Sequence, residues 1–350
     1  MSCSRKLCLS AAVAFALAST VGIGAQDATD IHGTWNGEFQ AAKLFIQLRT
    51  TSPDGGNWNS GQTIATDEFG GLPVNDERFT ASALKFDLRR EAGTLAFDGA
   101  FRDGRGAGLF TFTPRPAFTA EMRAIGYSDD LPLWRRYQLA IHDIGPKYVK
   151  ALQAEGYSKL PLDTIQRART HGVTIDYIKS MKVEGYTNLP IEDLVRVRDH
   201  GVTAAYVQGM KRLGFSNQAV EDLVRARDHG VTPEFIQELR DQGVAVQTLG
   251  EFVRVRDHGV KAAFIRELAA QGYKNVSVDQ VVRLRDHGVS AEYLADMKDL
   301  GIKDLTLDQI VRLRDHGITP GFVNHVRARG FKDASADELI RLKNGGLWKR

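Results

Sequence analysis

The stretch "LVRVRDHGVT" occupies Leu194–Thr203, and close copies of it follow along the chain. They are "LVRARDHGVT" from Leu223, "FVRVRDHGVK" from Phe252, "VVRLRDHGVS" from Val281 and "IVRLRDHGIT" from Ile310. Each copy begins 29 residues after the one before it. A repeat this regular predicts a row of similar structural units stacked on one another.

Two residue types mark the repeat over a longer range. Histidines recur every 29 residues from His142 to His316, and a series of glycines keeps the same interval from Gly156 to Gly330. Neither series slips by a residue. The repeat therefore extends over most of the chain beyond residue 117.

The residues around each histidine predict the end of one helix and the start of the next. A glycine in the left-handed conformation after His200 would end a helix and bring Val202 against Val197. Thr203 is then a good N-cap for a second helix. The same residues recur as expected structural caps at His171, Gly172, His200, Gly201, His229, Gly230, His258, Gly259, His287, Gly288, His316 and Gly317.

Each unit is thus expected to contain two short helices. Such a pair alone buries too little surface to be stable, so the sequence predicts an α-helical solenoid or a superhelical bundle. The array is expected to open with a lone helix near residues 118–125 and to close with one at residues 334–346. In that last helix Asn344 replaces the aspartate and Gly345 replaces the histidine, as expected of a capping unit.

The region before the repeats has a different period. Apolar residues alternate in "KLFIQLR" from Lys43, "ALKFDLR" from Ala83, "TLAFDGAF" from Thr94 and "GLFTFTP" from Gly108. This pattern predicts a small antiparallel β sandwich or barrel, in which "DGRGAG" from Asp103 is a hairpin turn and not a phosphate loop. The expected fold class is α+β, with a signal peptide at 1–25, a β-domain at 26–116 and an α-helical repeat domain at 117–350.

The first 25 residues resemble an export signal. Arg5 and Lys6 precede an apolar run from Leu7 to Ala25, which predicts a secretory signal peptide cleaved near Ala25. The alternative is an uncleaved membrane anchor. Cleavage would remove Cys3 and Cys8, the only two cysteines, and lower the formal charge from +3 to +1. We expect a periplasmic or secreted protein that has no further membrane span and does not bind nucleic acid.

The histidine beside an aspartate raises the question of chemistry. A metal site needs several ligands around one ion, whereas stacked helices lie about 8–10 Å apart. We therefore expect the histidines to be structural, with no metal and no cofactor. No nucleophile elbow, phosphate loop or other catalytic constellation stands out, so no catalytic residue is expected and the protein is predicted not to be an enzyme.

The aspartate itself needs an explanation, because an acid in the last turn opposes the helix dipole. We expect Asp199 to take part in an Arg–Asp network between repeats, while Glu192 supports Arg196 within its own helix. The alternative is that the second arginine of each unit belongs to a surface that binds an anionic partner. This candidate interaction face consists of Arg169, Arg198, Arg227, Arg256, Arg285 and Arg314.

The unit "LVRxRDHGVTxxYIxxMKxxGY" resembles a helical repeat of exported bacterial proteins. It also resembles the C-terminal repeat extensions of membrane metallopeptidases related to beta-lactam sensors, over about residues 118–350. The resemblance implies an envelope-facing interaction or sensory region, without the peptidase part. We expect a non-enzymatic scaffold with a protein partner in the cell envelope; the alternative is an envelope sensory protein whose β-domain holds a small molecule or glycan.

Overall fold

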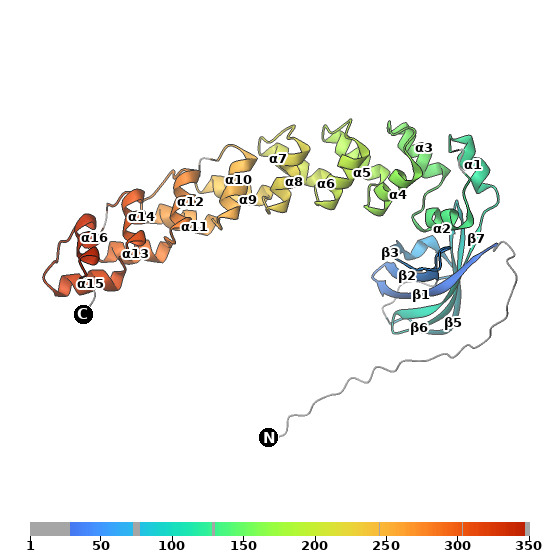
Figure 1. Ribbon diagram of the computed structural model, residues 1–350, viewed down its shortest axis with the longest axis horizontal. Helices are drawn as coiled ribbons and strands as arrows, with labels where there is room; N and C mark the ends of the chain where they lie inside the picture. Colours follow the sequence, from blue (N-terminus) through green and yellow to red (C-terminus); the bar gives the residue numbers. More distant parts are fainter. Residues whose placement is uncertain (1–28, 73–77, 128–129, 245, 303, 347–350) are drawn as a thin grey trace, which may run out of the picture. The chain divides into compact units, whose positions relative to one another are not determined.

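The computed structural model describes residues 29–72, 78–127, 130–244, 246–302 and 304–346 (Figure 1). The expected signal peptide lies outside these ranges. The chain forms two compact units, Met1–Gly145 and Pro146–Arg350. The first is built around a β-sheet and the second from helices alone, so the predicted α+β class is confirmed.

The first unit contains one curled, seven-stranded antiparallel sheet with the strand order β3-β2-β1-β7-β6-β5-β4. It is an open half-barrel and not a pair of packed sheets. The alternating segments of the sequence lie in β2, β5, β6 and β7, as predicted. The strands are β1 (Ile31–Gln40), β2 (Lys43–Thr51), β3 (Asn57–Ala65), β4 (Phe69–Gly70), β5 (Ala81–Arg90), β6 (Gly93–Arg102) and β7 (Arg105–Pro114), and a 3-10 turn (Thr66–Glu68) precedes β4.

The inner face of the sheet is filled with aromatic rings. Trp35 on β1 meets Phe86 on β5 edge to face, with ring centroids 5.2 Å apart, and Phe86 stacks on Phe97 at 4.7 Å. The expected hairpin between β6 and β7 turns at Asp103 and Gly104, both of which have positive φ. The predicted hairpin is thus present, but only Asp103 and Gly104 form its turn, because residues 105–108 already belong to β7.

Helix α2 (Leu133–Ile141) packs on β1, β6 and β7 and belongs to the first unit. Its Tyr137 stacks on Phe110 at 6.0 Å and meets Trp58 at 5.4 Å. The division between the two compact units falls at Pro146, so α2 is grouped with the sheet, whereas the change of sequence period lies near residue 117. Residue period records the type of structure, whereas the unit boundary depends on which surface a helix covers.

Sixteen α-helices lie in the described part of the chain. Those after α1 contain nine residues each. The helices are α1 (Phe118–Ala124), α2 (Leu133–Ile141), α3 (Pro146–Ala154), α4 (Leu162–Thr170), α5 (Ile175–Val183), α6 (Ile191–Asp199), α7 (Ala204–Arg212), α8 (Val220–Asp228), α9 (Pro233–Asp241), α10 (Leu249–Asp257), α11 (Ala262–Ala270), α12 (Val278–Asp286), α13 (Ala291–Asp299), α14 (Leu307–Asp315), α15 (Pro320–Ala328) and α16 (Ala336–Asn344).

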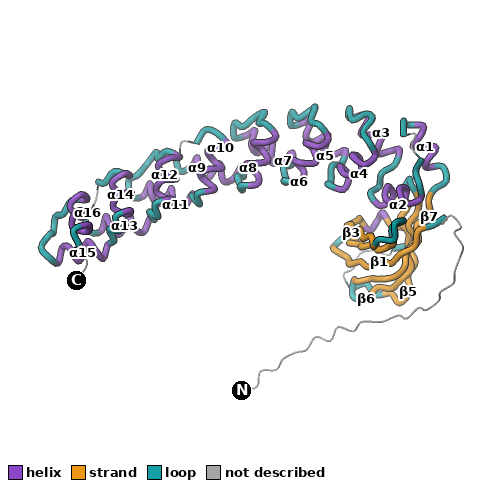
Figure 2. The backbone as a smooth tube through the Cα atoms, in the orientation of Figure 1, coloured by secondary structure: helices purple, strands orange, loops and turns teal. Residues whose placement is uncertain are grey.

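The helices of the second unit form two layers (Figure 2). Even-numbered helices from α4 to α16 each contact the next even-numbered helix, and odd-numbered helices from α3 to α15 do the same. This is the arrangement expected of a solenoid, in which each repeat touches mainly its neighbours. No helix in the described ranges is both long and apolar enough to cross a membrane.

The junction between the two helices of a repeat has the predicted geometry. Val202 donates its backbone N–H to the carbonyl of Val197 at 2.8 Å, and both side chains are completely buried. Gly201 has a φ of +69° and donates to the carbonyl of Arg198. The Thr203 hydroxyl accepts the N–H of Tyr206 at 3.2 Å. These contacts confirm the helix-ending and helix-starting roles inferred from "HGVT".

Candidate functional site

A row of histidine–aspartate pairs links successive repeats. In each pair the imidazole Nδ1 of one repeat bonds the carboxylate of the aspartate 28 residues later. The contacts are short, from 2.5 to 2.8 Å. The pairs are His171–Asp199, His200–Asp228, His229–Asp257, His258–Asp286 and His287–Asp315, and His316 bonds Asn344 at 3.3 Å in the same way.

These pairs explain the aspartate that opposes the helix dipole. The expected Arg–Asp network is wrong, because the partner of each of these aspartates is the preceding repeat's histidine. The side chains remain about 40% exposed, with His200 at 39% and Asp228 at 44%. Within the ranges that the structure describes, no group of three or more His, Cys, Asp or Glu side chains surrounds a common point. Each histidine thus has two structural roles, as the C-cap residue and as a cross-link.

The first arginine of each unit also bonds the next repeat. Arg167 pairs with Glu192 at 2.7 Å, and Arg196 pairs with Glu221 instead of with Glu192 in its own helix. The expected i, i+4 pair is therefore replaced by an inter-repeat pair, since the acid one repeat on lies beside the guanidinium. The series continues with Arg254–Asp279, Arg283–Asp308 and Arg312–Asp337.

One ion pair of this series is missing, the one that Arg225 would make. The residue 25 positions after Arg225 is Gly250, where the other units carry an acid. Among the described residues Arg225 has no ion pair. The packing of α8 against α10 therefore lacks this ion pair, although the His229–Asp257 contact at the ends of the two helices remains.

The second arginine of each unit lies over an aromatic ring of the preceding odd-numbered helix. The guanidinium carbon of Arg198, for example, is 5.1 Å from the centre of the Tyr177 ring. Cation–π attraction of this kind fixes the direction of a side chain that is otherwise flexible. The pairs are Arg169–Tyr148, Arg198–Tyr177, Arg227–Tyr206, Arg256–Phe235, Arg285–Phe264 and Arg314–Tyr293, and Lys343 lies over Phe322 in the last unit.

These stacked second arginines differ from the first arginines, most of which form ion pairs with acids of the next repeat. In the described part of the chain no carboxylate lies within ion-pair distance of Arg198, Arg227, Arg256 or Arg285. All four are exposed. Arg314 donates its Nε–H to the carbonyl of Gly288 at 2.9 Å, which leaves its charge unopposed by an acid. The residues of the candidate interaction face thus share one environment, each over a ring of the preceding odd-numbered helix and 29 residues after the one before it.

The rings beneath the arginines are held by the following repeat. The Tyr177 hydroxyl donates to the carbonyl of Val202 at 2.8 Å, and Tyr206 and Tyr293 make the equivalent bonds to Val231 and Ile318. Burial of the phenol raises the pKa of Tyr177 to about 12, although the nearby Arg198 charge acts in the opposite direction. Sequence reasoning missed these bonds, yet an aromatic residue 21 positions before each second arginine was a visible signal.

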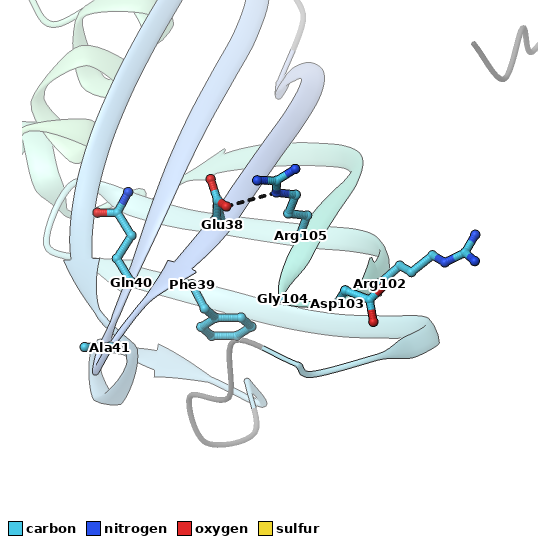
Figure 3. A pocket seen from close by; sticks show the side chains of 8 residues that line it. All are labelled: Glu38, Phe39, Gln40, Ala41, Arg102, Asp103, Gly104 and Arg105. Carbon is cyan, nitrogen blue, oxygen red and sulfur yellow. Dashed lines mark hydrogen bonds and ion pairs between the residues drawn. The ribbon is translucent and has the colours of Figure 1, made fainter. Parts of the chain in front are cut away.

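The β-unit offers two spaces of different kinds. An open hollow of about 960 Å³ lies beside the end of β1 and the β6–β7 turn. There Glu38 pairs with Arg105 at 2.9 Å, and Arg102 extends away from them (Figure 3). A second space, inside the curled sheet next to Ile141, has only about 10 Å³.

Comparisons with protein-family models, with curated proteins and with solved structures find no match to this chain.

Proposed function

We propose that this protein is a non-enzymatic, exported scaffold whose helical array binds a protein partner in the cell envelope. The proposal rests on one observation above all: Arg198, Arg227, Arg256 and Arg285 are exposed, are stacked on rings and have no carboxylate within ion-pair distance among the described residues. Most other charged positions common to the units, namely the first arginines except Arg225, the aspartates and the histidines, bond a neighbouring repeat. The partner surface would be rich in carboxylates.

Stacking suits these arginines to recognition. A guanidinium that is already immobilised loses little conformational entropy when a carboxylate binds it. The ring leaves the planar N–H groups free to make a two-pronged contact with an acid. Single exposed ion pairs are weak, at about 0–1 kcal/mol, but several at fixed intervals on a rigid support act together.

Specificity would come from a different surface. The exposed positions of the odd-numbered helices differ from unit to unit, unlike those of the even-numbered helices. In α5 they include Asp176 and Lys179, and in α7 Ala205 and Gln208. A uniform arginine edge would supply attraction, while this variable face would select the partner.

The alternative is that the β-unit holds a small molecule or glycan. The space inside the sheet, about 10 Å³, is no larger than one water molecule requires. A ligand there would have to displace packed aromatic side chains, and the outer hollow near Glu38 is open to solvent. These two observations make the scaffold the better supported proposal.

A pair of matched triple variants tests the arginine face. Arg198, Arg227 and Arg256 are changed together to Gln, and the control changes Arg167, Arg196 and Arg254 to Gln. Both remove three positive charges from even-numbered helices. Binding to immobilised poly-L-glutamate is measured at increasing salt. We expect salt-sensitive binding by the parent chain and the control, and a loss of at least tenfold in the first variant only. Equal losses in both variants would reduce the effect to net charge and contradict the proposal.

Export has its own test. N-terminal sequencing of the protein from an envelope or medium fraction of a bacterial host should give a start close to Gln26. A chain that keeps Met1 and stays in the cytoplasmic fraction would contradict the proposed compartment while leaving the binding test unaffected.

A further inference from the structure

A partly enclosed hollow of about 150 Å³ lies inside the helical array, beside α13 and α14. Its lining is mixed, and Gln271, Lys298 and Asp304 contribute polar groups to it. The other lining residues are Tyr273, Tyr293, Leu294, Met297, Ile302, Leu305, Ile310 and Leu313. Tyr293 also lines the hollow and is the ring beneath Arg314. A role of this hollow nevertheless does not depend on the function proposed above.

Another repeat of the same chain indicates what fits this space. Two repeats earlier, Phe215 stands at the position of Tyr273 and Phe252 at that of Ile310. The Phe252 ring packs edge-on against Phe215, with centroids 5.9 Å apart at 87°. Ile310 has no ring to place against Tyr273, and the hollow lies between these two residues and their neighbours.

The wall formed by Tyr273 is fixed in place. Its hydroxyl donates to the carbonyl of Leu305 at 3.0 Å, so the phenol is anchored at its far end while its ring lines the hollow. Met297 on α13 contributes a thioether, which makes favourable contacts with aromatic rings. The hollow is therefore preformed and offers edge-on and sulfur contacts to a guest.

We propose that this hollow binds a single uncharged aromatic ring. A cavity of about 150 Å³ is large enough for a molecule of the size of benzene. A phenol would also bring a hydroxyl to the polar side chains Gln271 and Lys298. The ring comes either from a free phenol-like molecule or from an aromatic side chain of a bound protein, and both share this chemistry.

The test uses the full chain and p-cresol, the side-chain analogue of tyrosine. Binding is followed by the NMR signal of the Met297 methyl group and by thermal melting. Ile310→Phe copies the natural Phe252 and should fill the hollow, whereas Ile310→Leu keeps the volume of the side chain and leaves the hollow open. We expect p-cresol to shift the Met297 signal and to raise the melting temperature of the parent and of Ile310→Leu. Ile310→Phe should bind at least tenfold more weakly.

The outcomes separate clearly. No shift of the Met297 signal in the parent at 10 mM p-cresol, or equal binding by Ile310→Phe, overturns the proposal. If Ile310→Phe melts far below the parent, the Met297 signal of the parent and of Ile310→Leu still decides the matter. The two sources are distinguished with N-acetyl-tyrosine amide: binding as tight as that of p-cresol indicates a protein side chain, and binding at least tenfold weaker indicates a free small molecule.

Discussion

The imidazole Nδ1 of His200 lies 2.7 Å from a carboxylate oxygen of Asp228 in the next repeat. Asp228 ends α8, where the helix dipole disfavours an acid. The histidine offsets that cost and joins the ends of two neighbouring helices. Since both side chains are about 40% exposed, we expect each such pair to contribute no more than about 1 kcal/mol. Their effect on the stability of the array comes from the sum of these small contributions over successive repeats.

The glycine after the histidine should matter more than the histidine itself. Gly230 has a φ of +69°, and a Cβ there would lie 3.4 Å from Nε of Arg256. We expect Gly230→Val to destabilise the array by about 2 kcal/mol or more, because a β-branched residue is strained in the left-handed region. His229→Gln should cost about 1 kcal/mol or less, as its amide still reaches Asp257. Urea melts of both variants decide the order; a larger loss for His229→Gln would show that we have misjudged the two roles.

A substitution at Gly250 should restore the missing ion pair with Arg225. Gly250 lies in α10 with open space around it, at the position where other units carry the acid that pairs with an arginine. Gly250→Glu should stabilise the array by about 1 kcal/mol from helix propensity alone, with a further gain from an ion pair with Arg225.

Gly250→Gln provides the control for that change, because it improves the helix without adding charge. The difference between the two variants, measured at low and at high salt, reports the effect of the added charge, which interacts with the N-terminus of α10 as well as with Arg225. If the Glu and Gln variants have the same melting temperature at low salt, position 250 does not reach Arg225.

The buried tyrosines predict a loss of stability at high pH. Burial raises the pKa of Tyr177 and of Tyr293 to about 12, while a tyrosine in the unfolded chain ionises near pH 10. Above about pH 10 the unfolded chain therefore releases protons that the folded chain retains. The free energy of unfolding should stay level up to about pH 9 and fall from about pH 10 to 12. Urea melts across this range test it, and a double variant with Phe at both positions should show a shallower fall.

Removing the Tyr137 hydroxyl from the β-unit should not lower the stability of the protein. The Tyr137 side chain is completely buried, and its hydroxyl has no hydrogen-bond partner among the described residues. Burial also raises the pKa of this phenol. Tyr137→Phe removes an unsatisfied polar group and keeps the ring stacked on Phe110, so we expect no change or a gain of about 1 kcal/mol.

Tyr206→Phe is the matched comparison, because that hydroxyl donates to Val231 at 2.9 Å. It should lose about 1 kcal/mol. A destabilised Tyr137→Phe would indicate that a water molecule or another group bonds the Tyr137 hydroxyl.

Local features of this protein could be predicted from sequence, because they depend on residues a few positions apart. The Gly201 turn, the Thr203 cap and the burial of Val197 against Val202 all belong to this class. The alternating segments also identified four strands of the sheet. What residue period could not supply was the surface each element covers, so α2 was assigned to the repeats although its Tyr137 packs on the sheet.

The contacts between repeats were harder to predict, since they require knowing how stacked helices are offset. Glu192 lies four residues before Arg196, a spacing that also suits a pair within one helix, and nothing local decides between Glu192 and Glu221. The regular spacing of 25 residues between every first arginine except Arg225 and an acid of the next repeat did indicate the inter-repeat pair. In the last unit Lys343 and Asn344 replace arginine and aspartate, yet they retain the contacts with Phe322 and His316.

The two partners of each inter-repeat contact are separated by a constant number of residues, and this affects how the number of repeats can change in evolution. Every cross-link joins a residue to one a fixed number of positions further on, so excising 29 consecutive residues brings the next unit into the same register. The arginines, histidines and acids on either side of the junction then meet equivalent partners. Unequal recombination within the gene can therefore add or remove whole units without creating a mismatched seam, and the number of units can evolve separately from the contacts that hold them together.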